Sequence, residues 1–373
     1  MKFSKIVYVV ALLLLQACGG NNAQILKQGK EINLDYAKNL KLSEVEPGVT
    51  LAYLTNPWSD GNFLAKYALV DKNRDIPAYL TDDFEIIRVP LENSIVYSGV
   101  HVSLLDEFGS FNNVKGVCDV SYIHDRKTLD AIKDRKIVDC GAGSSPNIEK
   151  ILMIRPEAVL LSPYENSDET RPFQKSGIKT ILTADYMENT PLGRAEWMRF
   201  YGRLYGKGPS ADSIFMKVRD EYESLKNKTK DVSNRPKVLF DRIYSGVWDV
   251  PTSSSVTGIL INDAGGENPF SKFTQKGSAH LSAEEVLINA QNSDIWLIRY
   301  IEPQLTLDAL KKDNPVYSRL KPFEQGNIYG SNTLNTNLFE DGAFHPERTL
   351  LEMIKLIHPE IESGDLKYYQ KLK

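Results

Sequence analysis

Few side chains in this sequence have the spacing that catalysis requires. The glycine- and serine-rich segment GAGSS, residues 141–145, lacks the Gly-x-Ser-x-Gly pattern of a nucleophile elbow. Pro146 stands where a Gly-x-Gly-x-x-Gly dinucleotide-binding pattern has its last glycine. Asp185 and Glu188 could act as a pair of carboxylates, although the same spacing is common at the start of a helix. We therefore predict that the protein is not an enzyme, with an extracytoplasmic hydrolase as the alternative.

Direct coordination of a metal ion is a second chemistry to consider. The five histidines are isolated from one another, with no second histidine three or four residues away: His101, His124, His280, His345 and His358. Ligands from distant loops could still meet in a folded site, so a direct metal-ion binder stays an alternative. The spacing itself predicts neither a metal site nor a cofactor.

Two acidic residues occupy equivalent places in a repeated pattern. Residues 146–165 (PNIEKILMIRPEAVLLSPYE) and 281–300 (LSAEEVLINAQNSDIWLIRY) each begin a helix with an acid, continue into a buried strand and end with an aromatic residue. The acids are Glu149 and Glu284, with Glu285 as the alternative in the second segment. An acid in the first turn of a helix contributes about 0.3–1 kcal/mol through the helix dipole, so a purely structural role would also explain both residues.

A second group of side chains follows the predicted strands. Ligands of parallel β/α sheets bind beyond the carboxyl ends of the strands, which makes these residues candidates for a cleft. They are Tyr97, Ser98, His101, Ser144, Tyr164 and Tyr186 in the first half of the chain, Arg242, Tyr244, Trp248, Arg299 and Tyr300 in the second half, and Trp58 from a hairpin. Aromatic walls suit a large, partly planar guest. Core packing is an equally good explanation for any single aromatic residue.

The elements that position these residues alternate in type. From residue 85, short apolar runs predict strands at 95–97, 114–118, 137–140, 158–161 and 180–183, with helical segments between them. A long helical segment follows, and a second strand–helix block begins at residue 236. The fold class is therefore α/β: two β/α lobes with mostly parallel sheets, joined by a single long helix. We assign residues 49–207 to the N-terminal lobe, 208–232 to the connecting helix and 233–373 to the C-terminal lobe with its terminal helix.

The N-terminus has the pattern of an exported lipoprotein. Lys2 and Lys5 precede an apolar run of ten residues, 6–15, which is too short to span a bilayer. Ala17 and Cys18 resemble a bacterial lipobox, so we expect a signal peptide at 1–17, lipidation of Cys18 and a tether over 18–48. An ordinary signal peptide cleaved nearby is the alternative. The protein is then periplasmic and lipid-anchored to a membrane.

Composition narrows the range of partners. The 45 basic and 49 acidic residues give a net charge of −4, and no basic tract is present, so nucleic acid is not an expected partner. Cys118 and Cys140 could form a disulfide in an oxidising compartment or remain two buried thiols. We expect the protein to be a monomer.

Five segments between about residues 50 and 360 resemble one family. They are PNIEKILMIRPEAVLL, ADYMENTPLGRAEWMRFYGRLYGK, YSGVWDVPTSSSVTGILINDAGG, LSAEEVL with DIWLI, and HPERTLLEMIKLIHPE. In this order they resemble the substrate-binding lipoproteins of ABC importers, of the ferric-siderophore and cobalamin type. The resemblance implies a cleft between the lobes that takes a metal chelate, with a ferric siderophore first and cobalamin or haem as alternatives. It also implies that Glu149 and Glu284, at the lobe tips, contact arginines of the permease subunits, while Arg242 and Arg299 complement an anionic iron chelate.

Overall fold

The computed structural model describes residues 30–165, 167 and 170–373, and its first element is a sheet that the sequence did not predict. The sheet has the order β1-β2-β3-β4-β5, in which only β4 and β5 are parallel. Its strands are β1 (Lys30–Ile32), β2 (Leu40–Glu46), β3 (Val49–Thr55), β4 (Phe63–Asp71) and β5 (Glu85–Val89). The hairpin expected near residues 50–71 is β3 and β4. Residues 30–48, which we expected as part of a tether, instead contribute β1 and β2, because Leu40 and Leu42 are buried against the core. The predicted signal peptide and Cys18 lie outside the described residues.

The N-terminal lobe contains a fully parallel sheet of order β12-β11-β6-β7-β8. Its strands are β6 (Ser94–Val96), β7 (Val114–Val117), β8 (Val138–Asp139), β11 (Ala158–Leu161) and β12 (Thr180–Leu182). All four residues of β11 are buried, as expected for a strand covered on both faces. The helices of this lobe are α2 (Gly99–Glu107), α3 (Arg126–Lys133), α4 (Ile148–Ile154) and α5 (Arg171–Gln174), and two short strands, β9 (Gly141–Ala142) and β10 (Ser145–Pro146), precede α4.

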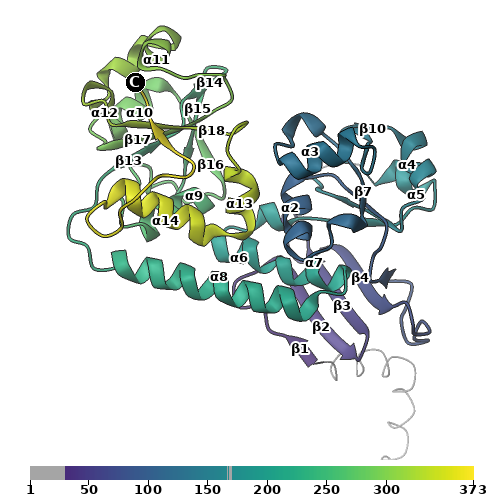
Figure 1. The fold of residues 1–373 in the computed structure, drawn as a ribbon. Coiled ribbons are helices and arrows are strands. Elements are labelled where there is room, and N and C mark those ends of the chain that lie inside the picture. Colours follow the sequence, from purple (N-terminus) through teal and green to yellow (C-terminus); the bar gives the residue numbers. More distant parts are fainter. Residues whose placement is uncertain (1–29, 166, 168–169) are drawn as a thin grey trace, which may run out of the picture.

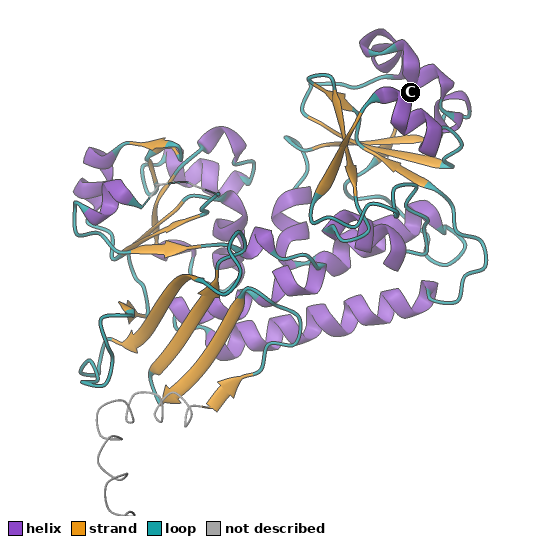
Figure 2. Cartoon of the chain, turned by 180° about the vertical axis from the view of Figure 1, so that it is seen from behind, coloured by secondary structure: helices purple, strands orange, loops and turns teal. Residues whose placement is uncertain are grey.

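The connecting helix α8 (Gly208–Thr229) confirms the predicted architecture of two lobes joined by one long helix. Its 22 residues span about 33 Å and run beneath both lobes (Figures 1 and 2). Ala211, Phe215, Val218, Tyr222 and Leu225 are buried at alternating spacings of four and three residues, so one face packs inward. That face contacts α7 (Met198–Leu204), which follows α6 (Pro191–Glu196), and the C-terminal helix α14 (Pro346–Ile357).

The C-terminal lobe repeats the plan with a smaller parallel core. Its main sheet has the order β13-β17-β18-β19, in which only β19 is antiparallel. These strands are β13 (Val238–Phe240), β17 (Ile295–Tyr300), β18 (Ile328–Asn332) and β19 (Gln370–Lys371). A second, antiparallel sheet consists of β14 (Ile243–Tyr244), β15 (Val247–Pro251) and β16 (Ser278–Leu281). The helices are α9 (Val256–Asp263), α10 (Ala283–Ala290), α11 (Leu307–Asp313), α12 (Lys321–Glu324) and α13 (Leu338–Phe344).

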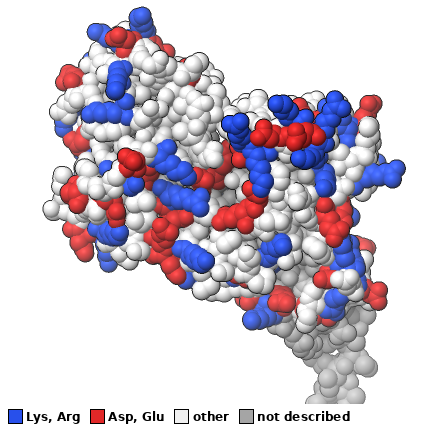
Figure 3. All heavy atoms as spheres, in the orientation of Figure 1, with Lys and Arg blue, Asp and Glu red and all other residues white. Residues whose placement is uncertain are grey.

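The lobes also touch directly, through α13 of the C-terminal lobe against α2 and α6. Nε2 of His345, which follows α13, lies 2.7 Å from Oε2 of Glu107 on α2, and its Nδ1 lies 2.8 Å from Oε1 of Glu347. Acidic side chains gather where the lobes meet on this face (Figure 3). Burial alone would lower the pKa of His345, but the hydrogen bonds to Glu107 and Glu347 outweigh it and raise the pKa to about 9. A protonated imidazole therefore joins the lobes at neutral pH.

Replacing this histidine should remove a pH-dependent part of the stability. Because the pKa of His345 is higher in the folded state than its ordinary value near 6.5, its contribution is complete below about pH 6.5 and is lost as the pH rises through about 9. We expect His345→Gln to lower the free energy of unfolding by about 3 kcal/mol at pH 6, with the difference shrinking towards pH 9.5. Urea denaturation across this range measures it. A pH-independent loss for His345→Gln would contradict the assignment.

Candidate ligand-binding cleft

A cavity of about 860 Å³ lies between the lobes and is lined by both of them. Loops after β6, β7 and β11 supply its N-terminal wall, and segments after β17 and β18, with α13, supply the other. Five apolar or aromatic side chains are exposed to it although they are large: Tyr122, Tyr164, Ile301, Leu334 and Phe339. Exposed apolar surface concentrated in a concave site indicates that a ligand covers it.

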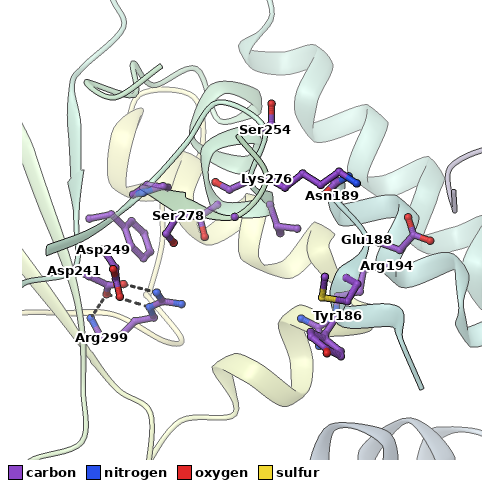
Figure 4. Close-up of a pocket in the computed structure, with 17 residues that line it drawn as sticks. Tyr186, Glu188, Asn189, Arg194, Asp241, Asp249, Ser254, Lys276, Ser278 and Arg299 are labelled. Carbon is purple, nitrogen blue, oxygen red and sulfur yellow. Dashed lines mark hydrogen bonds and ion pairs between the residues drawn. The ribbon is translucent and has the colours of Figure 1, made fainter. Parts of the chain in front are cut away.

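The smaller cavity, of about 340 Å³, lies beside the connecting segment and is more polar (Figure 4). Tyr186 and Arg194 face it from the N-terminal lobe, and Arg299 and Lys276 face it from the C-terminal lobe. Arg194 lines both cavities, so its guanidinium contributes a cation to each of them, and the two cavities are called the cleft below.

A buried carboxylate holds Arg194 in this place. Asp185 lies 3.2 Å from Nε of Arg194, 2.8 Å from Nε2 of His101 and 2.7 Å from the hydroxyl of Tyr201. Burial would raise the pKa of Asp185, but the charges and hydrogen bonds of His101 and Arg194 outweigh it and hold the pKa at about 2. Asp185 is therefore ionised at neutral pH. Among the described residues, the two terminal nitrogens of Arg194 have no partner, so they remain available to a ligand in the cleft.

The other arginines of the cleft region are already paired. Arg299 makes two hydrogen bonds to the carboxylate of Asp241, one of them 3.1 Å from Nε to Oδ1, and its guanidinium stacks over Phe240 and Phe339. Arg299 and Asp241 both line the smaller cavity, where their charges neutralise each other. Arg242 pairs with Glu302 and with Asp313 and lines neither cavity. Arg242 was predicted to lie in the cleft, but its guanidinium is paired with carboxylates outside both cavities.

The structure brings half of the predicted cleft residues together. Those that line a cavity are Tyr97, Ser98, Ser144 and Tyr164 in the larger one, and Tyr186 and Arg299 in the smaller one. The structure corrects the rest. Trp58 lies in the turn between β3 and β4, and Tyr244 is 81% exposed on β14, away from both cavities.

Three predicted cleft residues belong instead to the core. Trp248 is fully buried, packs against Trp296 and Tyr317 with ring centroids 5.9 and 5.6 Å apart, and donates a hydrogen bond from Nε1 to the carbonyl of Phe240. Tyr300 is buried in the same hydrophobic cluster. His101 is buried against Asp185 and reaches the cleft only through Arg194.

Sequence reasoning missed Arg194, Tyr122, Lys276, Leu334 and Phe339. Leu334 follows β18, so the rule on strand ends could have found it. Arg194 lies inside α6 and Lys276 precedes an antiparallel strand, and no strand-end signal marks either residue.

Cys118 and Cys140 are buried free thiols in the structure. Cys118 and Cys140 directly follow the neighbouring strands β7 and β8, and burial raises the pKa of Cys140 to about 11. Of the two alternatives for these cysteines, the structure therefore has two buried thiols and no disulfide between them. Within the described part of the chain, no three His, Cys, Asp or Glu side chains form a group that could hold a metal ion.

The two predicted docking acids occupy matching positions. Glu149 is the second residue of α4 after its N-cap Asn147, and Glu284 is the second residue of α10 after its N-cap Ser282. Both are exposed, and neither has a hydrogen-bond or ion-pair partner among the residues the structure describes. Glu285 accepts hydrogen bonds from the backbone and hydroxyl of Ser282 in a capping box, so its carboxylate already has a structural role.

Two lobes joined by one long helix, with cavities lined from both lobes, are the arrangement of a two-lobed binding protein. The family model described as periplasmic binding protein matches residues 96–332, and the chain belongs to this family. It is the substrate-binding component of an ABC importer and not an enzyme. Among the residues described, no helix has both the length and the apolar character needed to cross a membrane.

Relatives and solved structures agree with this assignment. The chain is 29% identical over 364 residues to an uncharacterised lipoprotein of Methanocaldococcus jannaschii, covering 92% of this chain and 84% of that one. It is 26% identical over 210 residues to the iron-uptake system-binding protein of Bacillus subtilis, covering 54% of this chain and 64% of that one. A periplasmic binding protein of Veillonella parvula has the same fold, with a TM-score of 0.61 at 14% identity, covering 83% of this chain and 98% of that one. The periplasmic haem-binding protein of Vibrio cholerae gives a TM-score of 0.59 at 19% identity, covering 72% and 100%.

The network beneath Arg194 makes a prediction about stability. We expect Asp185→Asn to lower the free energy of unfolding by about 2–3 kcal/mol at pH 7, because His101 and Arg194 lose their buried counter-charge. The pKa of Asp185 is depressed, so this contribution is complete above about pH 4 and is lost as the pH falls towards 2. Denaturation with urea at pH 7 and pH 3 measures the difference. Asp130→Asn, an exposed carboxylate on α3, should change stability by less than about 0.5 kcal/mol. An equal loss at both pH values for Asp185→Asn would contradict the assignment.

Proposed function

We propose that the protein captures an anionic ferric siderophore in the interlobe cleft and delivers it to an ABC permease. The observation that carries the proposal is that Arg194 lines both cavities, with two guanidinium nitrogens that have no partner among the described residues, beside apolar walls from both lobes. A volume of about 860 Å³ suits a ligand of several hundred daltons. A guanidinium fork recognises carboxylate, catecholate or similar paired oxygens. In such a complex the metal is cargo inside its chelate and needs no protein ligand.

The relatives support uptake of iron in complexed form. One is named as an iron-uptake system-binding protein, and another, from Staphylococcus aureus, as a high-affinity haem uptake system protein. Haem is the second candidate ligand, because Tyr122 and His124 line the larger cavity and phenolate and imidazole both ligate haem iron. Cobalamin, a further chelate of similar size, is the third.

Delivery of the ligand to the permease would involve the lipid anchor at Cys18 and the two acids Glu149 and Glu284. Lipidation of Cys18 would keep the protein at the periplasmic face of a membrane as a monomer, beside the permease. Glu149 and Glu284 lie on helices α4 and α10, which are both on the side of the molecule away from α8 (Figure 1). Exposed carboxylates without partners suit arginine forks, whose bidentate hydrogen bonds fix orientation.

Ligand binding tests the first part of the proposal. Isothermal titration calorimetry with a ferric catecholate, a ferric hydroxamate, cobalamin and haem should show tightest binding of the anionic ferric catecholate. Arg194→Gln should weaken that binding by about 10- to 100-fold, because it removes a charge-assisted hydrogen bond, and should change binding of a neutral hydroxamate by less than about threefold.

The matched control is Arg126→Gln on α3, whose exposed side chain lines neither cavity and which should leave all affinities unchanged. Tightest binding of haem, with a shifted Soret band that Tyr122→Phe or His124→Gln abolishes, would favour the second candidate. Absence of binding for all four ligands would refute the proposal.

Docking is tested separately from binding. The double variant Glu149→Lys and Glu284→Lys should abolish ligand uptake in cells while its affinity for the ligand stays within about twofold of the wild type, because both residues lie outside the cavities. The double variant Glu221→Lys and Asp231→Lys, at two exposed acids on α8 and just after it, provides the charge-matched control and should transport normally. Loss of ligand affinity in the double variant would show that these acids serve the cleft instead.

A further inference from the structure

Outside the cleft, two exposed apolar side chains lie one helical turn after the proposed docking acids. Met153 on α4 is 81% exposed and Ile288 on α10 is 77% exposed. Neither lines a cavity described above. Each follows its acid by four residues, Glu149 and Glu284 respectively, so acid and apolar residue share one helix face.

The two helices match position by position. Counted from the side-chain N-caps Asn147 and Ser282, the acid stands second and the exposed apolar residue sixth in both. The residues at the third position, Lys150 and Glu285, are both engaged in their own lobes: Lys150 donates to the carbonyl of Asp139, and Glu285 closes the capping box. In both lobes, therefore, the side chains at the second and sixth positions are exposed and are not engaged in the contacts that hold the helix to its lobe.

Charge decides what kind of partner covers these residues. A membrane surface with anionic lipids would attract basic residues next to an apolar anchor, whereas here each apolar residue stands beside an unpaired carboxylate. A protein surface that offers a cation next to an apolar hollow satisfies both side chains at once. Because the pattern occurs once per lobe, the partner must present such a surface twice.

We infer that Met153 and Ile288 are the apolar halves of two matching docking points, and that the permease receives each of them in a hollow beside the cation that binds the acid. This inference rests on the proposed docking function. It adds to that function an apolar contact that slows dissociation from the permease. Charged residues at a rim mainly steer encounter, while a buried apolar side chain slows release. The two lobes are then recognised by the same chemistry.

Equilibrium binding of the full-length lipidated protein to the importer's membrane subunits in nanodiscs tests the inference. Met153→Gln and Ile288→Gln, which make the side chain polar without lowering helix propensity, should each weaken binding about tenfold and together about a hundredfold, mainly through faster dissociation. Met216→Gln, an exposed methionine on α8, is the matched control and should bind as the wild type does. Ligand affinity in solution should be unchanged in all three.

A photo-crosslinking residue at 153 or 288 supplies a readout that a purely structural role would not move. Both positions should give adducts with the membrane subunits, and position 216 should give none. Wild-type affinity and no adducts for the 153 and 288 variants, with binding lost on Glu149→Gln and Glu284→Gln, would overturn this inference and leave acid docking intact. Wild-type affinity in the glutamine variants of the acids as well would overturn docking through these helices altogether.

Discussion

The buried carboxylate of Asp185 is the interaction on which the cleft depends. A charge withdrawn from water is tolerated only where opposite charge and hydrogen-bond donors surround it. Here the donors come from three different helices: His101 from α2, Tyr201 from α7 and Arg194 from α6. The contacts that neutralise Asp185 also fix Arg194 through Nε, and its other two nitrogens have no partner among the described residues. The guanidinium of Arg194 is thus held in place by the need to neutralise the buried carboxylate of Asp185. Ordering this side chain on binding would therefore cost little conformational entropy.

Two further buried carboxylates near Asp185 in the sequence, those of Glu188 and Glu196, hold neighbouring segments in place in the same way. The buried carboxylate of Glu196 accepts backbone N–H groups of residues 35–37, and that of Glu188 accepts those of residues 38 and 39 together with Nε1 of Trp197. These bonds attach the N-terminal sheet to α6 and α7, which in turn contact α8, α13 and α14. Both lobes therefore share one helical base, with the hydrogen bond between His345 and Glu107 across their contact. The contacts that hold the walls of the cleft therefore belong to the fold itself.

Particular residues show where reasoning from the sequence succeeded. Tyr97, Ser98 and Ser144 lie in loops beyond parallel strands, where the strand-end rule applies directly. The rule failed for Trp248 because residues 247–251 form an antiparallel strand whose inward side chains cover the core of the lobe. It failed for Tyr300 because β17 continues through that residue, which still pairs with Asn332. The segment expected as a tether became strands because alternate residues of β2 find apolar partners in α-helices and strands far along the chain.

The sequence alone determined the alternation of strands and helices within the two lobes, the long connecting helix and the two acid-started helices, because each depends on the spacing and capping of neighbouring residues. The class of protein followed from the resemblance of five segments to a known family. The tertiary structure alone decided which side chains meet: Arg194 between two cavities, Asp241 neutralising Arg299, and His345 reaching a glutamate 238 residues away. It also showed that the capping box engages Glu285 and not Glu284. Contacts between distant segments leave no local periodicity, so burial and charge pairing become visible only once the lobes have been packed together.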